Sequence, residues 1–216
     1  MKKVLFVLFA LLFTCSVVFA GGSNEAATTQ KSGIKDTLVI GVAQQINELN
    51  PMMQNDQINN NCFALTHEVV LTVDANNGYA VMPELAQEWE WIDDTHLILK
   101  LNKNVRFSNG TPLTAEDVVF TLNRARSTDP TVSKISGTIS LIADVTALDD
   151  YTVQLTTSTF TNEIIYSLCA YPLSIQSKKA WEDPSIKEPW LIGTGPYKLK
   201  EWKEGQYVTF EKVENY

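Results

Sequence analysis

Two segments of this chain share a design in which a pair of adjacent aspartates separates a short apolar or aromatic run from an alternating strand. The first spans 89–101 around Asp93-Asp94, and the second spans 145–155 around Asp149-Asp150. Aspartate side chains bond to their own backbone and favour tight turns, so each segment predicts a β-hairpin. Paired carboxylates also serve acid/base catalysis and metal binding, but neither pair has a third candidate ligand beside it. The turn interpretation is preferred, and it commits this region to antiparallel sheet.

A helix with clear start and stop signals lies between the two hairpins. The Asn109-Gly110 pair marks a turn, and Thr114 then stands as an N-cap with an acid three residues later. Apolar positions at helical spacing follow on one face: Ala115, Val118, Val119, Leu122 and Ala125. Arg124 and Arg126 suit the dipole of the last turn. The pattern predicts a helix from 114 to about 127.

Other elements follow from shorter signals. The β-branched run 38–42 predicts a buried strand that stops before the Asn50-Pro51 turn. Near-helical spacing of apolar residues predicts a helix within 56–70, and a further helix is predicted at 161–169. Strict alternation on both sides of Glu204-Gly205 predicts a last hairpin over 195–213.

The N-terminus has the three parts of a secretory signal. Lys2 and Lys3 precede an apolar run, and small residues stand near Ala20, so residues 1–20 are predicted to be a signal peptide cleaved after Ala20. A membrane span is disfavoured because the apolar run is broken. A loose lipobox ending at Cys15 leaves a lipid anchor as an alternative. Residues 21–36 have the composition of a flexible leader. The signal peptide predicts that the protein is periplasmic or otherwise extracytoplasmic.

Composition excludes some partners. Removing residues 1–20 takes away two of the 17 basic residues and no acidic one, which leaves 15 against 25 and a net charge of −10. Nucleic acid is therefore not expected as a partner. With 44% hydrophobic residues the chain can build packed cores, so general disorder is excluded.

Candidate metal, cofactor and catalytic groups are few. Cys62 and Cys169 lack CxxC spacing, and an oxidising compartment would permit a disulfide between them. His67 and His96 carry no motif, so these four residues are interpreted as structural, with no metal site and no cofactor. The chain lacks a glycine-rich phosphate loop, a GxSxG elbow and an HExxH helix.

Four motifs occur in an order that resembles one family. Residues 82–89, the Asp93-Asp94 turn, residues 105–118 and residues 193–197 are similar to the ordered motifs of the family 5 bacterial extracellular solute-binding proteins. That family serves importers of peptides, dipeptides, nickel and related solutes. The similarity extends over nearly all of residues 37–216.

The resemblance implies a mixed α/β fold of the periplasmic-binding-protein type, in which two α/β lobes enclose the ligand and one lobe carries an inserted extra domain. On this mapping 37–72 and 189–216 are segments of the first lobe, and 73–188 is the extra α/β domain. The second lobe is absent, and the fold is incomplete. Because family members are typically more than twice as long, the chain is interpreted as an N-terminal fragment or a truncated gene product.

The resemblance also implies the function. The expected role is the solute-binding component of an ABC importer, with a small peptide as the favoured ligand, an ABC permease in the membrane as partner, and a monomer when complete. Alternatives are a binding protein for nickel or an oligosaccharide, or a truncated envelope protein that no longer transports. An exported hydrolase is disfavoured because no nucleophile stands with a base, so the chain is not expected to be an enzyme.

Candidate ligand contacts lie in the loop after the first strand, which contributes to the cleft in this family. The candidates are Asn50, Met52, Met53, Gln54, Asn55 and Asp56. Methionine adapts to varied guests, and the polar side chains suit amides or amines, although an ordinary solvated loop is the alternative. Residues 133–140 are a second candidate, polar where several peptide-binding relatives carry aromatic residues. Trp89, Trp91 and Phe107 are expected in the core rather than on a ligand platform.

Overall fold

The computed structural model describes residues 36–54, 56–214 and 216. The predicted signal peptide, Cys15, nearly all of the leader and Asn55 lie outside the described residues. Residues 1–41 and 42–216 are separate units, and Val42–Tyr216 is described here by itself. Within the described part of the chain, no helix combines the length and the apolar character needed to cross a membrane.

The strand predicted at 38–42 is wrong. These residues belong to no helix or strand, and the side chains of Leu38 and Val39 are 83% and 86% exposed. An apolar β-branched run becomes a buried strand only where neighbouring strands supply hydrogen bonds and a packed face. None of the strands in the described part of the chain pairs with 38–42.

The first helical region is confirmed, with a shorter helix than predicted. A 3-10 helix, η1 (Pro51–Met53), precedes α1 (Gln57–Thr66). The α1 helix begins after Asp56 and ends before His67, whose φ of −134° is extended. A hairpin that the sequence interpretation missed follows, with β1 (Leu71–Asp74) paired to β2 (Ala80–Pro83). Its turn contains Gly78 and Tyr79 at positive φ, a conformation that an Asn-Asn-Gly sequence favours.

Both aspartate hairpins are confirmed, and they join into one antiparallel sheet. Strands β3 (Ala86–Trp91), β4 (His96–Leu101), β5 (Ile142–Asp149) and β6 (Thr152–Thr157) lie in the order β3-β4-β6-β5. Asp93 Oδ1 accepts the N–H of Thr95 at 2.7 Å, and Asp149 Oδ1 accepts the N–H of Tyr151 at 2.8 Å. The aspartates therefore close turns, as interpreted.

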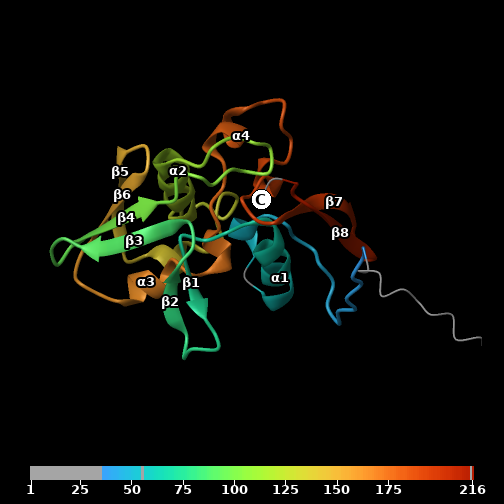
Figure 1. The fold of residues 1–216 in the computed structure, drawn as a ribbon, viewed down its shortest axis with the longest axis horizontal. Helices are drawn as coiled ribbons and strands as arrows, with labels where there is room; N and C mark the ends of the chain where they lie inside the picture. Colours follow the sequence, from blue (N-terminus) through green and yellow to red (C-terminus); the bar gives the residue numbers. More distant parts are fainter. Residues whose placement is uncertain (1–35, 55, 215) are drawn as a thin grey trace, which may run out of the picture. The chain divides into compact units, whose positions relative to one another are not determined.

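Helix α2 (Ala115–Ala125) packs on β5 and β6 and covers one face of this sheet (Figure 1). The side chain of Asp117 accepts the Thr114 N–H at 2.9 Å and its hydroxyl at 3.0 Å, so the predicted start is confirmed. The predicted apolar face is buried in the core, except that Val119 is half-buried. Phe107 is 2% exposed, and Trp89 and Trp91 pack against the same core, as expected.

The segment after the sheet consists of short elements. They are α3 (Glu163–Ser167), η3 (Tyr171–Leu173), α4 (Lys178–Glu182) and η4 (Pro189–Leu191), while η2 (Ser136–Ile139) precedes β5. The helix predicted at 161–169 is confirmed in shorter form as α3. The last predicted hairpin is confirmed as β7 (Tyr197–Lys203) and β8 (Tyr207–Lys212), with Gly205 at φ +72° in the turn.

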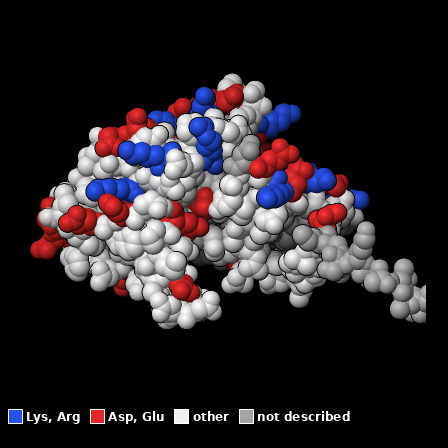
Figure 2. All heavy atoms as spheres, in the orientation of Figure 1, with Lys and Arg blue, Asp and Glu red and all other residues white. Residues whose placement is uncertain are grey.

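The four-stranded sheet and α2 fall within 73–188, and the β7–β8 hairpin falls within 189–216. The assignment of these ranges to an extra domain and a first lobe stays a prediction. On the face shown in Figure 2, Lys and Arg lie interspersed with Asp and Glu, without a continuous basic area. That distribution agrees with the acidic net charge of −8 for the whole chain.

Candidate functional site

The loop predicted to contact ligand is organised around two helix starts. Asn50 caps η1, because its Oδ1 accepts the Met52 N–H at 3.2 Å. Asp56 caps α1, because its Oδ1 accepts the Asn59 N–H at 2.9 Å. Pro51 stands at the first position of η1, where its missing N–H costs nothing. These polar side chains therefore hold the shape of the loop.

Burial separates the predicted contact residues from one another. Met52 is 1% exposed and belongs to the hydrophobic core. Met53 and Gln54 are half-buried, and no hydrogen bond joins the Gln54 side chain to another described residue. Asn55 lies outside the described residues. Met53 and Gln54 are thus the predicted side chains that remain available to a ligand.

The second predicted segment, 133–140, lies beside the first. The Lys134 N–H donates to the Met52 carbonyl at 2.9 Å. The Ser133 hydroxyl donates to the Ala125 carbonyl at 2.9 Å and accepts the Ile135 N–H at 3.2 Å, so this serine is engaged in holding the backbone. The structure therefore brings together the two segments that the sequence singled out separately.

Gln176 connects this region to Trp181 of α4, and the sequence interpretation missed it. Its side chain is fully buried, with Nε2 3.5 Å from Asn50 Oδ1 and Oε1 accepting the Trp181 Nε1–H at 2.9 Å. Its backbone N–H donates to the Thr121 hydroxyl at 2.9 Å. Gln176 lies between η3 and α4, where no sequence motif marks it, and its contacts with Thr121 and Asn50 join residues distant in sequence.

A pair of half-buried carboxylates, Glu68 and Glu84, lies beside the Tyr216 hydroxyl. That hydroxyl donates to Glu68 Oε1 at 2.9 Å, whereas Glu84 Oε2 is buried without a hydrogen-bond partner among the described residues. Burial, and then the negative charge of Glu68, raises the pKa of Glu84 from 4.5 to about 7. Burial also raises the pKa of Glu68. Glu84 stands inside a family motif, but its pairing with Glu68 has no sequence signal.

We expect Glu84→Gln to stabilise the protein at pH 8. A folded-state pKa above the unfolded value means that the folded protein binds more protons between about pH 4.5 and 7, so stability falls as pH rises through this range. Discounted for solvent screening, the charge costs about 1–2 kcal/mol at pH 8. Urea denaturation should show this gain at pH 8 and none at pH 4.

Glu88→Gln is the matched control for that prediction, because Glu88 is exposed and its Oε2 lies 3.1 Å from Lys100 Nζ. The control variant should show no gain that depends on pH in this range. A gain of equal size at pH 4 and pH 8 for Glu84→Gln would show that its charge is not the cause.

The two described cysteines are free thiols, so the disulfide that the compartment would permit is not formed in this structure. Burial, and then the charge of Asp56, raises the pKa of Cys62 to about 11. Burial, and then the charge of Glu84, raises the pKa of Cys169 to about 11. Both stay protonated at neutral pH and are poor nucleophiles. The described residues contain no group of three or more His, Cys, Asp or Glu placed to hold a metal ion.

The fold is similar to those of solved binding proteins. NikZ from Campylobacter jejuni, solved with Ni(L-His), matches 84% of this chain and 36% of its own chain, with a TM-score of 0.71 at 26% identity. OppA from Burkholderia pseudomallei matches 81% of this chain and 38% of its own, with a TM-score of 0.72 at 23% identity, which supports the fold alone. The class is therefore that of a periplasmic binding protein, of which this chain supplies a part.

Sequence comparison defines the family. The model of the bacterial extracellular solute-binding proteins, family 5 Middle, matches residues 80–216, and the chain belongs to this family. The oligopeptide-binding protein AppA of Bacillus subtilis is 27% identical over 224 residues, which are 100% of this chain and 41% of that protein. The probable ABC transporter periplasmic-binding protein SapA of Escherichia coli is 25% identical over 237 residues, 97% of this chain and 43% of that protein. The chain thus spans about two fifths of the length of these relatives, which are binding proteins rather than enzymes.

Proposed function

We propose that this chain is part of the extracytoplasmic solute-binding component of an ABC importer. The observation that carries the proposal is the family match over residues 80–216. The signal peptide predicted at 1–20 supports export, and the proposed partner is a membrane permease that recognises the ligand-bound form. The complete protein is expected to act as a monomer.

A short peptide is the proposed ligand. Relatives named for oligopeptides, for peptide transport and for glutathione support this choice. The nickel complex in NikZ and the mannopinic acid complex of MoaA keep metal complexes and small organic acids as alternatives within the family. We assign the ligand-contact role to the segment 50–56, with Met53 and Gln54 as its available side chains, together with 133–140 beside it.

Calorimetry tests the proposal, with the protein expressed from its complete coding sequence and titrated with a panel of small molecules. The panel contains a dipeptide, a tripeptide, a pentapeptide, Ni(L-His) and a short oligosaccharide. At least one peptide should bind with a Kd on the order of 1 μM, because closure of two lobes buries most of the ligand surface. Binding of Ni(L-His) or the oligosaccharide without any peptide would refute the peptide assignment.

The chain that ends at Tyr216 is expected to bind the same peptide much more weakly, on the order of 1 mM or not at all, since it carries one side of the cleft. Micromolar binding by residues 1–216 alone would contradict the proposal that this chain carries only one side of the cleft.

A further inference from the structure

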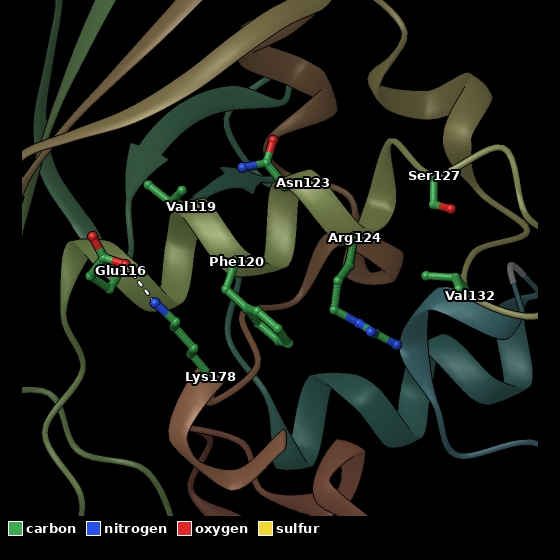
Figure 3. A pocket seen from close by; sticks show the side chains of 8 residues that line it. All are labelled: Glu116, Val119, Phe120, Asn123, Arg124, Ser127, Val132 and Lys178. Atoms are coloured by element: carbon green, nitrogen blue, oxygen red, sulfur yellow. Dashed lines mark hydrogen bonds and ion pairs between the residues drawn. The ribbon is translucent and has the colours of Figure 1, made fainter. Parts of the chain in front are cut away.

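A pocket of about 430 Å³ lies along the outer side of α2, away from the sheet (Figure 3). Val119, Phe120 and Val132 supply apolar walls, and Arg124 reaches along one end. At the other end the Lys178 ammonium lies 2.8 Å from Glu116 Oε2, so these two charges neutralise each other. Apolar walls beside a charged side chain that remains available suit a small molecule with both an apolar and a polar part.

Arg124 is held in place by aromatic rings rather than by an acid. Its guanidinium lies 3.8 Å from the centroid of the Trp181 ring and 5.5 Å from that of Phe120. Trp181 is itself fixed, because its Nε1–H donates to the buried Gln176 at 2.9 Å and its ring lies 5.9 Å from that of Trp190. Stacking uses the faces of a guanidinium and leaves the N–H donors at its edge free.

The positive charge of Arg124 has no counterpart among the described residues. No hydrogen bond or ion pair engages it there, and its Nε is buried without a partner. Burial lowers the pKa of Arg124, as expected for a charge removed from water. The neighbouring Arg126 differs, since its guanidinium donates to Asn123 Oδ1 at 3.1 Å and to the Ala143 carbonyl. An uncompensated, partly desolvated guanidinium is the group that binds carboxylates most strongly, by two parallel hydrogen bonds.

We propose that this pocket binds a small organic carboxylate, whose carboxylate accepts hydrogen bonds from Arg124 and whose apolar group lies against Phe120, Val119 and Val132. The pocket is lined by α2, by Ser127 and Val132 of the loop after it, and by Lys178 of α4, and none of its lining residues belongs to the predicted contact segments 50–56 and 133–140. The proposal does not depend on the importer assignment, and a failure of either leaves the other standing.

N-acetyl-leucine and N-acetyl-leucinamide form a matched pair of probes, because they differ in the carboxylate alone. Titration of the full chain, followed by calorimetry and by the Trp181 indole N–H resonance, should give a Kd of about 1 mM for the acid, typical of one charge-assisted contact. The amide should bind about tenfold or more weakly. Equal binding of acid and amide, or no binding of the acid up to about 20 mM, would overturn the proposal.

Arg124→Gln should weaken binding of the acid about tenfold or more and leave binding of the amide unchanged. Arg124→Lys keeps the charge and should give an intermediate loss, which covers the case in which the glutamine variant melts early. Lys103→Gln is the control, since Lys103 also lies over an aromatic ring, 5.5 Å from the centroid of Tyr151, but outside the pocket. The idea fails if Arg124→Gln binds the acid as well as the Lys103→Gln control does.

Discussion

Gly195→Ala, and likewise Gly193→Ala, is expected to lower the free energy of unfolding by at least about 3 kcal/mol. A Cβ at Gly193 would lie 2.1 Å from the Thr66 carbonyl oxygen and 2.6 Å from the His67 ring. At Gly195 it would lie 2.6 Å from the Thr66 carbonyl carbon and 2.7 Å from the His67 nitrogen. These are mostly backbone atoms at the end of α1, which cannot swing aside. The Gly195 N–H also donates to the Thr66 carbonyl at 3.0 Å, so the two segments cannot separate without losing that bond.

Urea denaturation followed by circular dichroism measures this effect. Gly137→Ala is the matched control, because an added Cβ there would have no atom within 4 Å and the residue is not at positive φ. The control should change stability by less than about 1 kcal/mol. Similar values for Gly137→Ala and Gly195→Ala would show that the close approach to Thr66 is not what requires glycine.

Lowering the pH from 7 to 4 is expected to cost about 3 kcal/mol of stability through His67 alone. Its ring is 2% exposed, with Nε2 3.0 Å from the Trp190 carbonyl and Nδ1 2.8 Å from the Thr66 hydroxyl. The carbonyl requires the proton on Nε2, so Nδ1 is an acceptor, and the Thr66 hydroxyl lies within hydrogen-bond distance of both Nδ1 and the Cys62 carbonyl. Burial lowers the pKa of His67 from 6.5 to about 4, against the hydrogen bond to Trp190.

The direction of this pH dependence follows from the number of protons that the folded and the unfolded chain bind. Between about pH 6.5 and 4 the unfolded chain binds a proton that the folded chain excludes, so stability is full above about 6.5 and is lost as pH falls toward 4. Glu84 and Glu68, with raised pKa values, act in the opposite direction, so the measured quantity is the difference between wild type and His67→Gln. Glutamine cannot gain a positive charge. Between pH 7 and 4 the free energy of unfolding of His67→Gln should therefore fall by about 3 kcal/mol less than that of wild type. Parallel curves for the two proteins would exclude His67 as the source.

The local elements of this fold were largely predictable. The aspartate hairpins, the capped helix after Thr114 and the final hairpin with Gly205 each depend on turn chemistry and periodicity within a few residues. The β1–β2 hairpin was missed, although Asn76-Asn77-Gly78 is a turn signal, because its strands are short. The run at 38–42 was predicted as a strand from its composition, and composition cannot supply a pairing partner.

The candidate site was predictable only in part. The sequence singled out 50–56 and 133–140 separately, and the hydrogen bond from Lys134 to Met52 places them together. Local chemistry explains why Asn50 and Asp56 cap helices, but only packing decides that Met52 is buried while Met53 is partly open. The buried Gln176 and the stacked Arg124 had no pattern of their own, because Thr121 and Trp181, which hold them, lie on other elements.

The glycines of 193–197 show the same division between properties that the sequence determines and properties that only the tertiary structure decides. The sequence by itself determined the family, the acidic balance, the turns and the helix starts, because these depend on residue types and on neighbours a few positions away. Only the tertiary structure decided why Gly193 and Gly195 have no side chain, why His67 stays neutral and why Glu84 carries a raised pKa. Each of these properties arises where residues distant along the chain come into contact and exclude water, and burial of this kind has no signature in a local stretch of sequence.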